Sequence, residues 1–113
     1  MLPSINRIKK EKDFGSIFKC SKSFKNNLFV FRAAKNNLGL VRFGFVVSQK
    51  VSKKATVRNK VRRRLSEAAK GQMKNIKNGT DIILIALAGL DKKELTEIKV
   101  GLIDALSKTR LLT

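Results

Sequence analysis

Histidine, tryptophan and tyrosine are missing from the 113-residue sequence, and cysteine and proline occur once each, as Cys20 and Pro3. A single cysteine excludes an internal disulfide, and the lack of histidine excludes the usual zinc sites and both Ser-His-Asp and Cys-His catalysis. No apolar run reaches the ~18 residues that a membrane-spanning helix needs, and residues 1–7 lack the apolar stretch of a signal peptide. These absences predict a soluble, cytoplasmic protein with no membrane association.

Acidic residues are scarce, because eight Asp and Glu stand against 26 Lys and Arg and leave a net charge of +18. Residues 1–80 hold 21 of the cations and three of the acids, whereas residues 81–113 hold five of each. The densest stretch, residues 50–64, has eight cations and no acid. Solubility needs only about 2–8 net charges on a small domain, so this excess indicates a polyanionic partner.

Three polyanions are candidates: nucleic acid, an anionic membrane surface and an acidic protein. A helix that lies on a membrane carries Trp, Phe or Leu opposite its basic face, and the basic segment does not show that pattern. The chemistry therefore favours nucleic acid, and the alternative is a charged face that meets only solvent.

The chain is predicted to form one domain over residues 1–113, since 42% of its residues are hydrophobic and no linker or repeat divides it. Apolar spacing predicts helices over residues 9–20 and 56–76, and a last helix that ends at about residue 110. It predicts strands over residues 28–34, 41–48 and 82–87. A further short strand is expected near residues 21–25. The order α-β-β-(β)-α-β-α predicts an α+β fold, in which helices pack on a small mixed sheet of three to four strands.

Four local features are expected within this fold. The strands over 28–34 and 41–48 are predicted to pair as an antiparallel hairpin. Thr56 is predicted to cap the long helix, which ends at Asn78-Gly79, and Asp91 with Glu94 to form a capping box for the last helix. The strand over 82–87 is continuously apolar, which is typical of a strand covered on both faces.

The helix over residues 56–76 turns Val57, Val61 and Leu65 toward the core and leaves a cationic outer face on its first turns. Like charges four residues apart weaken an isolated helix, so their repetition indicates a helix that binds phosphates. Arginine can contact a phosphate through two N–H groups, and asparagine can contact a base edge or a 2′-hydroxyl. The residues of this face are Arg58, Asn59, Lys60, Arg62, Arg63 and Arg64, and Lys50, Lys53 and Lys54 precede them in a loop.

The run over residues 57–63, Val-Arg-Asn-Lys-Val-Arg-Arg, resembles the Arg-Asn-Arg signature helix of the bacterial ribonuclease P protein family. Other segments are similar to that family in the same order. They are Leu2-Pro3 with residues 6–10, Asp13-Phe14 with residues 17–19, residues 44–50, and Gly79-Thr80-Asp81 before the Ile-rich strand. The resemblance covers nearly the whole chain.

The resemblance implies a protein subunit that binds a large catalytic RNA, and together they remove the 5′ leader from precursor tRNA. It implies that the RNA holds the catalytic Mg²⁺ ions and performs the cleavage, so that this chain has no catalytic residue and no certain metal of its own. The implied partners are ribonuclease P RNA and precursor tRNA, and the chain alone is expected to be a monomer. The resemblance also implies a left-handed β-α-β crossover, against the general rule.

Residue by residue, the resemblance assigns RNA binding to Arg58, Asn59 and Arg63, with Lys60 and Arg62 at positions where the family has basic residues. It further implies that a cleft between the first helix and the sheet holds the leader, with candidate residues Phe14, Phe18, Phe31 and Arg32. The sequence departs from the family pattern in two places, and each concerns single contacts. Ser66 replaces a frequent Arg, with Arg64 where a hydrophobic residue is common, and Gln49 replaces a frequent Lys.

The cleft residues have plain alternatives. Phe14 and Phe18 either pack in the core or stack on leader bases, where each stack is worth about 1–3 kcal/mol. Arg32 either binds leader phosphate or meets solvent. The sequence leaves open whether the side of the sheet that forms the cleft carries the aromatic residues Phe29, Phe31, Phe43 and Phe45.

Two other functions compete with the subunit. One is a ribosomal or RNA-chaperone-type module that binds structured RNA without leader specificity. The other is a stand-alone nuclease, which is disfavoured because the only close pair of acids is Glu11 and Asp13.

Overall fold

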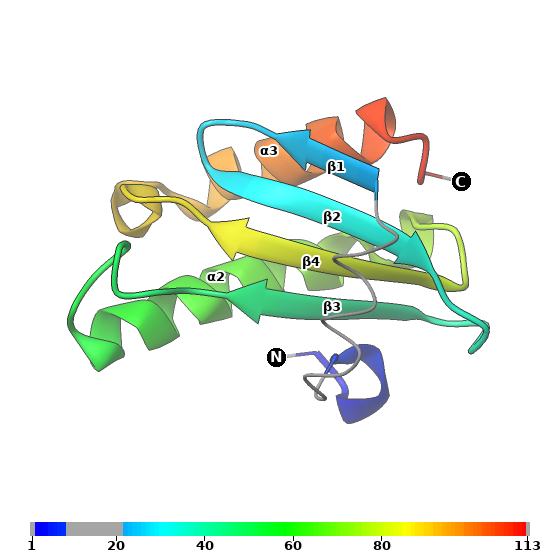
Figure 1. Cartoon of the computed structure of the whole chain (residues 1–113), viewed down its shortest axis with the longest axis horizontal. Helices are drawn as coiled ribbons and strands as arrows, with labels where there is room; N and C mark the ends of the chain where they lie inside the picture. Colours follow the sequence, from blue (N-terminus) through cyan, green and yellow to red (C-terminus); the bar gives the residue numbers. More distant parts are fainter. Residues whose placement is uncertain (1, 9–21, 113) are drawn as a thin grey trace.

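The computed structural model describes residues 2–8 and 22–112, in which a four-stranded sheet carries two long helices on one face (Figure 1). The predicted helix over residues 9–20 lies outside the described residues. The α+β class and the short strand near residues 21–25 are confirmed. In chain order the elements are η1 (Ser4–Asn6), β1 (Lys22–Lys25), β2 (Phe29–Lys35), β3 (Val41–Val46), α2 (Ala55–Gln72), η2 (Met73–Asn75), β4 (Thr80–Ala86), η3 (Leu90–Lys92) and α3 (Leu95–Lys108).

The strands lie in the order β1-β2-β4-β3. β2 is antiparallel to β1 and to β4, whereas β3 and β4 are parallel. The predicted hairpin between the strands now named β2 and β3 is therefore wrong, because β4 lies between them. β4 is apolar on both faces, and both are covered: Ile82 and Leu84 pack in the core under the helices, and Ile83 packs against Ile8 on the other face.

β3, α2 and β4 form a β-α-β unit whose two strands are parallel neighbours. In Figure 1 both strands point to the left, β4 lies above β3, and α2 returns behind the sheet. This is a left-handed crossover, as the family resemblance implied, and it departs from the right-handed rule.

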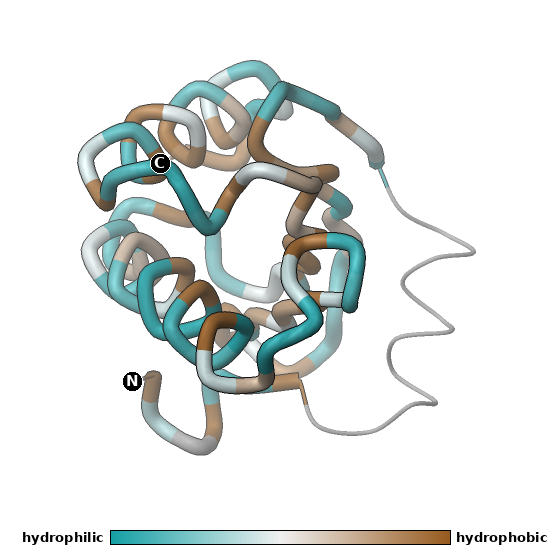
Figure 2. Tube along the Cα trace, turned by 90° about the vertical axis from the view of Figure 1, so that its left-hand side faces the viewer, coloured by the Kyte–Doolittle hydropathy of each residue, from teal (hydrophilic) through white to brown (hydrophobic). Residues whose placement is uncertain are grey.

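The core lies between the sheet and the two helices. Along α2 and α3 hydrophilic and hydrophobic residues alternate, as the colours of Figure 2 show, and the hydrophobic ones face the sheet. The predicted inward face of α2 is confirmed at Val61 and Leu65, and Val57 is half-buried. The buried residues of this core are Phe29, Phe31 and Ala33 of β2, Val41 and Phe43 of β3, Ile82 and Leu84 of β4, Val61, Leu65, Ala68 and Ala69 of α2, and Ile98, Leu102, Ala105 and Leu106 of α3.

The predicted caps are not formed. α2 begins at Ala55 with Lys54 as its N-cap, and neither Lys54 nor the α3 N-cap, Glu94, makes a side-chain cap hydrogen bond. Thr56 is already inside α2, and Asp91 belongs to η3. Both helices are therefore held by the burial of their apolar faces, which supplies most helical stability in proteins.

Candidate nucleic-acid interface

The loop between β3 and α2 is anchored by two buried valines and exposes its lysines. Val47 and Val51 are buried in the core, and the Val51 N–H donates to the Ser48 carbonyl at 3.1 Å. Lys50, Lys53 and Lys54 are exposed. The fixed loop thus places three cations at the end of the molecule where α2 begins.

The first turns of α2 continue this cationic surface. Val61 and Leu65 are buried against the sheet, whereas Asn59, Lys60 and Arg63 are exposed. These three residues of the predicted basic face therefore point outward. The set is called the loop–helix surface below, and it comprises Lys50, Lys53, Lys54, Arg58, Asn59, Lys60, Arg62 and Arg63.

Two arginines of this surface also tie the helix to the loop. Arg58 Nη1 donates to the carbonyls of Ser52 and Lys53, both at 3.0 Å. Arg62 donates to Asn59 Oδ1 at 2.8 Å and to the Val47 carbonyl at 3.4 Å. Arg58 and Arg62 therefore contribute positive charge, but some of their N–H groups are already hydrogen-bonded within the protein. Lys60 and Arg63 are the helix cations most available to a ligand.

Arg64 faces a different neighbour. Its Nη1 donates to the carbonyls of Asp91 and Lys93, at 3.1 and 3.0 Å, and so holds η3 against α2. This bond pattern explains the departure from a hydrophobic residue at this position. Ser66 is buried, with 3% of its surface exposed, so the replacement of a frequent Arg at this position removes no cation from the outward face.

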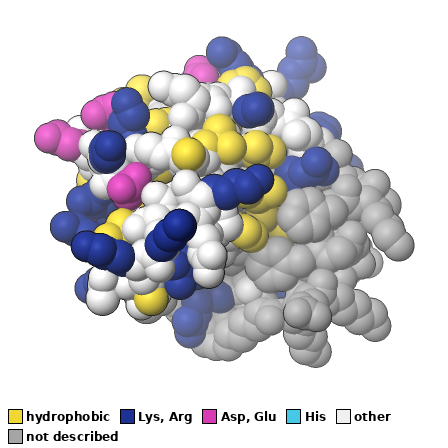
Figure 3. Space-filling model, turned by 60° about the vertical axis from the view of Figure 1, so that its left-hand side comes forward, with side chains coloured by type: hydrophobic (Ala, Val, Ile, Leu, Met, Phe, Trp, Pro, Cys, Tyr) yellow, Lys and Arg dark blue, Asp and Glu magenta, His cyan; other side chains and the backbone are white. Residues whose placement is uncertain are grey.

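The loop–helix surface is not neutralised internally. Among the described residues, ion pairs join Arg42 to Asp81, Lys93 to Glu97 and Lys108 to Asp104, and none of them includes a cation of this surface. Figure 3 shows Lys and Arg side chains across the lower part of this end, with the Asp and Glu side chains gathered toward the upper left. The surface therefore presents its charge outward.

Two of the predicted cleft residues, Phe31 and Arg32, lie on opposite faces of the sheet. Arg32 lies on that face, half-buried and in register with Ile83 of β4, while Ile8 and Ile83 form a small buried cluster there. Phe31 points the other way and is fully buried in the core. The assignment of Phe31 to a cleft is thus wrong, because its ring is sealed beneath the helices.

The other candidate aromatic residues either pack in or beside the core or lie outside the described residues. Phe29 and Phe43 are buried in the core, and the half-buried Phe45 ring stacks on Phe43 with centroids 5.9 Å apart. Phe14 and Phe18 lie outside the described residues. The side of the sheet that carries Phe29, Phe31, Phe43 and Phe45 is therefore the side that the helices cover, and it forms the core.

Residues 2–8 and 22–112 contain neither a metal-ligand cluster nor a membrane-spanning helix. No group of three or more His, Cys, Asp or Glu residues occurs there that could hold a metal ion. No helix in the same part of the chain is long and apolar enough to cross a bilayer.

Comparisons with known proteins agree over almost the full length. The family model described as Ribonuclease P matches residues 2–110. A protein of Clostridium botulinum named ribonuclease P protein component is 36% identical over 104 residues, covering 91% of this chain and 93% of the relative. One of Alkaliphilus oremlandii with the same name is 32% identical and covers 98% of this chain and 96% of the relative.

Solved structures show the same fold. The RNase P protein of Staphylococcus aureus superposes with a TM-score of 0.85 at 31% identity, covering 96% of this chain and 98% of that one. That of Thermotoga maritima superposes with a TM-score of 0.80 at 32% identity, covering 90% and 96%. Since one family model spans nearly the whole chain and these relatives share both sequence and fold, the chain belongs to the ribonuclease P protein family.

Proposed function

We propose that this chain is the protein subunit of ribonuclease P, which assists a catalytic RNA in removing the 5′ leader from precursor tRNA. The observation that carries the proposal is the loop–helix surface, where seven cations gather without a carboxylate partner among the described residues. Family membership supports ribonuclease P RNA as the RNA that this surface contacts. Exposed Lys60 and Arg63 contact its phosphates, and Asn59 donates from its amide to a base edge or a 2′-hydroxyl.

The chemistry is assigned to the RNA and its Mg²⁺ ions. Within the described residues, the donor set that Mg²⁺ prefers, several carboxylates held together, is not assembled. The role of this chain is to bind and position. It acts in the cytoplasm, as a monomer before it joins the RNA.

The first test is cleavage of precursor tRNA by the ribonuclease P RNA of the source organism, at low Mg²⁺, with and without this protein. Marked stimulation is expected, with no cleavage by the protein alone. The variant Lys60→Gln/Arg63→Gln should lose most of the stimulation, whereas the matched control Lys92→Gln/Lys99→Gln should keep it. Failure to stimulate, combined with tight binding to ribosomal RNA, supports a ribosomal or chaperone-type module instead, and cleavage by the protein alone supports a nuclease.

Leader binding belongs to the sheet face that carries Arg32, together with Phe14 and Phe18 as the resemblance implies. Arg32→Gln and Phe18→Ala should each weaken binding of precursor tRNA and leave binding of mature tRNA nearly unchanged, since only the precursor carries the leader. Lys99→Gln, an exposed change on α3 at the opposite side of the sheet, is the matched control for Arg32→Gln. Equal losses for both tRNAs would remove this assignment.

A further inference from the structure

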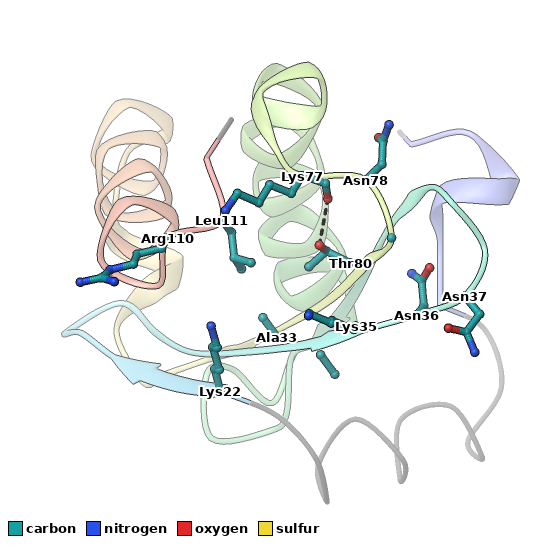
Figure 4. A pocket seen from close by; sticks show the side chains of 12 residues that line it. Lys22, Ala33, Lys35, Asn36, Asn37, Lys77, Asn78, Thr80, Arg110 and Leu111 are labelled. Carbon is teal, nitrogen blue, oxygen red and sulfur yellow. Dashed lines mark hydrogen bonds between the residues drawn. The ribbon is translucent and has the colours of Figure 1, made fainter.

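A second cationic site lies at the end of the sheet away from the loop–helix surface (Figure 4). A pocket of about 820 Å³ opens there between the strands and the segment after α3. Its walls come from the start of β1, the end of β2, the loop before β4 and the C-terminal segment. This site is called the far-end pocket below, and its polar residues include Lys22, Lys35, Asn36, Lys77, Asn78 and Arg110.

The far-end pocket gathers positive charge from four separate segments. Lys22, Lys35, Lys77 and Arg110 line it, all four are exposed, and no Asp or Glu is among the lining residues. None of the four forms an ion pair with a carboxylate of the described residues. In Figure 4 the side chains of Lys22, Lys35 and Lys77 extend into the space between the sheet and the C-terminal segment. Cations that share one hollow repel one another, and a bound anion relieves that repulsion.

The carboxylate of Asp81, adjacent in sequence to the pocket residue Thr80, does not offset these charges. Asp81 follows the lining residue Thr80, yet it is buried and already bound on the other side of the sheet. Arg42 donates to both of its oxygens, at 2.8 and 2.6 Å, and Asn36 Nδ2 donates to Oδ1 at 2.7 Å. Asp81 is thus neutralised by Arg42, which leaves the pocket lysines uncompensated.

The backbone walls of the pocket are fixed in place. The Asn36 N–H donates to the Gly79 carbonyl at 2.8 Å, and the Lys77 N–H donates to the Leu111 carbonyl at 2.9 Å. Gly79 has φ +78°, and a Cβ there would lie 3.3 Å from the Asn36 carbonyl oxygen, so the two loops approach closely. Thr80 Oγ1 also donates to the Lys77 carbonyl at 2.8 Å, as the dashed line of Figure 4 marks. A rigid wall with long cationic side chains suits a charged ligand whose exact position can vary.

We propose that the far-end pocket binds phosphate groups of an RNA strand and gives the protein a second RNA contact. The inference rests on the proposed function. The exposed amides of Asn37 and Asn78 add donors and acceptors for a 2′-hydroxyl or a base edge. A free nucleotide has the same chemistry and is the alternative source of phosphate that the test must separate.

The two cationic sites act separately. They lie at opposite ends of β4, whose seven residues span about 20 Å. That separation exceeds the Debye length of ~8 Å at physiological salt, so neither site substitutes for the other. An RNA that fills both must extend across the protein.

The test compares two triple variants with equal loss of charge. Lys22→Gln/Lys35→Gln/Lys77→Gln removes the pocket lysines, and Lys25→Gln/Lys92→Gln/Lys99→Gln removes three exposed lysines outside both sites. Affinity for the ribonuclease P RNA of the source organism is measured against KCl concentration. The pocket variant should bind at least tenfold more weakly at low salt, with a salt slope smaller by about 2–3, because each lost phosphate contact lowers the slope by about one. Equal behaviour of the two variants overturns the proposal.

A second measurement keeps this outcome separate from failure of the proposed function. Amide NMR signals of residues 36–37 and 78–79 are followed while bulk tRNA or AMP is added. Micromolar tRNA should shift these signals in the unmodified protein and not in the pocket variant, while AMP should shift them only at millimolar concentration. Saturation by micromolar AMP assigns the pocket to a free nucleotide, and no shift with tRNA overturns RNA binding there, even if the protein stimulates cleavage. If ribonuclease P RNA is not bound but tRNA shifts these signals, the proposed function fails and the pocket assignment stands.

Discussion

The helices α2 and α3 pack on the same sheet face in the same way and differ in what they present to solvent. Each buries an apolar stripe, with Leu65 of α2 and Leu102 of α3 fully covered. On α3, Lys108 pairs with Asp104 at 3.4 Å and Glu97 with Lys93 at 3.8 Å, whereas the α2 cations have no such partners among the described residues. Since packing accounts equally for both helices, the unpaired charge of α2 is not needed for folding. Like charges four residues apart even weaken a helix slightly, which points to an external partner.

The largest effect is expected for truncation of one buried leucine in each helix, which tests whether both helices depend equally on core packing. Leu65→Ala and Leu102→Ala should each lower the free energy of unfolding by about 2–5 kcal/mol, because each leaves a cavity at a fully buried site. Urea unfolding measures both. A loss below 1 kcal/mol for either variant would show that this helix is not held by its buried stripe.

The next prediction separates two neighbouring arginines of α2 by stability. Arg64→Ala should lower the free energy of unfolding by about 1–3 kcal/mol, because the carbonyls of Asp91 and Lys93 lose their donor. Arg63→Ala, at an exposed position, should stay within about 0.5 kcal/mol. The same urea experiment applies, and similar losses for both would contradict the structural role of Arg64.

The RNA affinity of the same two variants should show the reverse order. Arg63→Ala should weaken binding of ribonuclease P RNA about tenfold, or ~1.4 kcal/mol, and reduce the salt slope by about one. Arg64→Ala should leave the slope unchanged, as should the control Lys99→Ala on α3. A slope that falls equally for Arg63→Ala and Lys99→Ala would mean that net charge, and not the loop–helix surface, determines binding.

The smallest effect is expected for a substitution that leaves a cation of α3 without its carboxylate partner, as on α2. Glu97→Gln removes the carboxylate that faces Lys93 and should change the free energy of unfolding by less than about 0.5 kcal/mol, because both groups are exposed. Thermal unfolding at low and high salt measures this change. A loss above 1 kcal/mol would show that charge pairing, and not packing alone, distinguishes the stability of the two helices.

Much of the fold was predictable because it depends on local periodicity. The spacing of Val61 and Leu65 predicted the inward face of α2 correctly. The order of the strands was not predictable from these patterns, since β2 and β3 alternate alike and Gly39, with φ +68°, suits a hairpin turn. The uniform apolarity of β4 was the signal that it lies in the centre.

The candidate site was predictable only as a set of cations. Sequence placed Arg58, Arg62 and Arg64 on one basic face, yet their donors reach the carbonyls of Ser52, Val47 and Asp91, and such contacts depend on tertiary structure. The far-end pocket was missed because its cations come from four segments that are distant in sequence. Phe31 was misplaced because alternation shows which residues share a face and not which face is covered.

The central position of β4 has a consequence for the order in which the protein is made. β4 is the last strand to be synthesised, yet it is the strand that joins β2 to β3. A nascent chain therefore carries every residue of the loop–helix surface before the sheet that supports this surface can close, and such long-range pairing slows folding. An RNA that binds only the closed form stabilises it by mass action. The loop–helix surface therefore gains its supporting sheet only after β4 has been made.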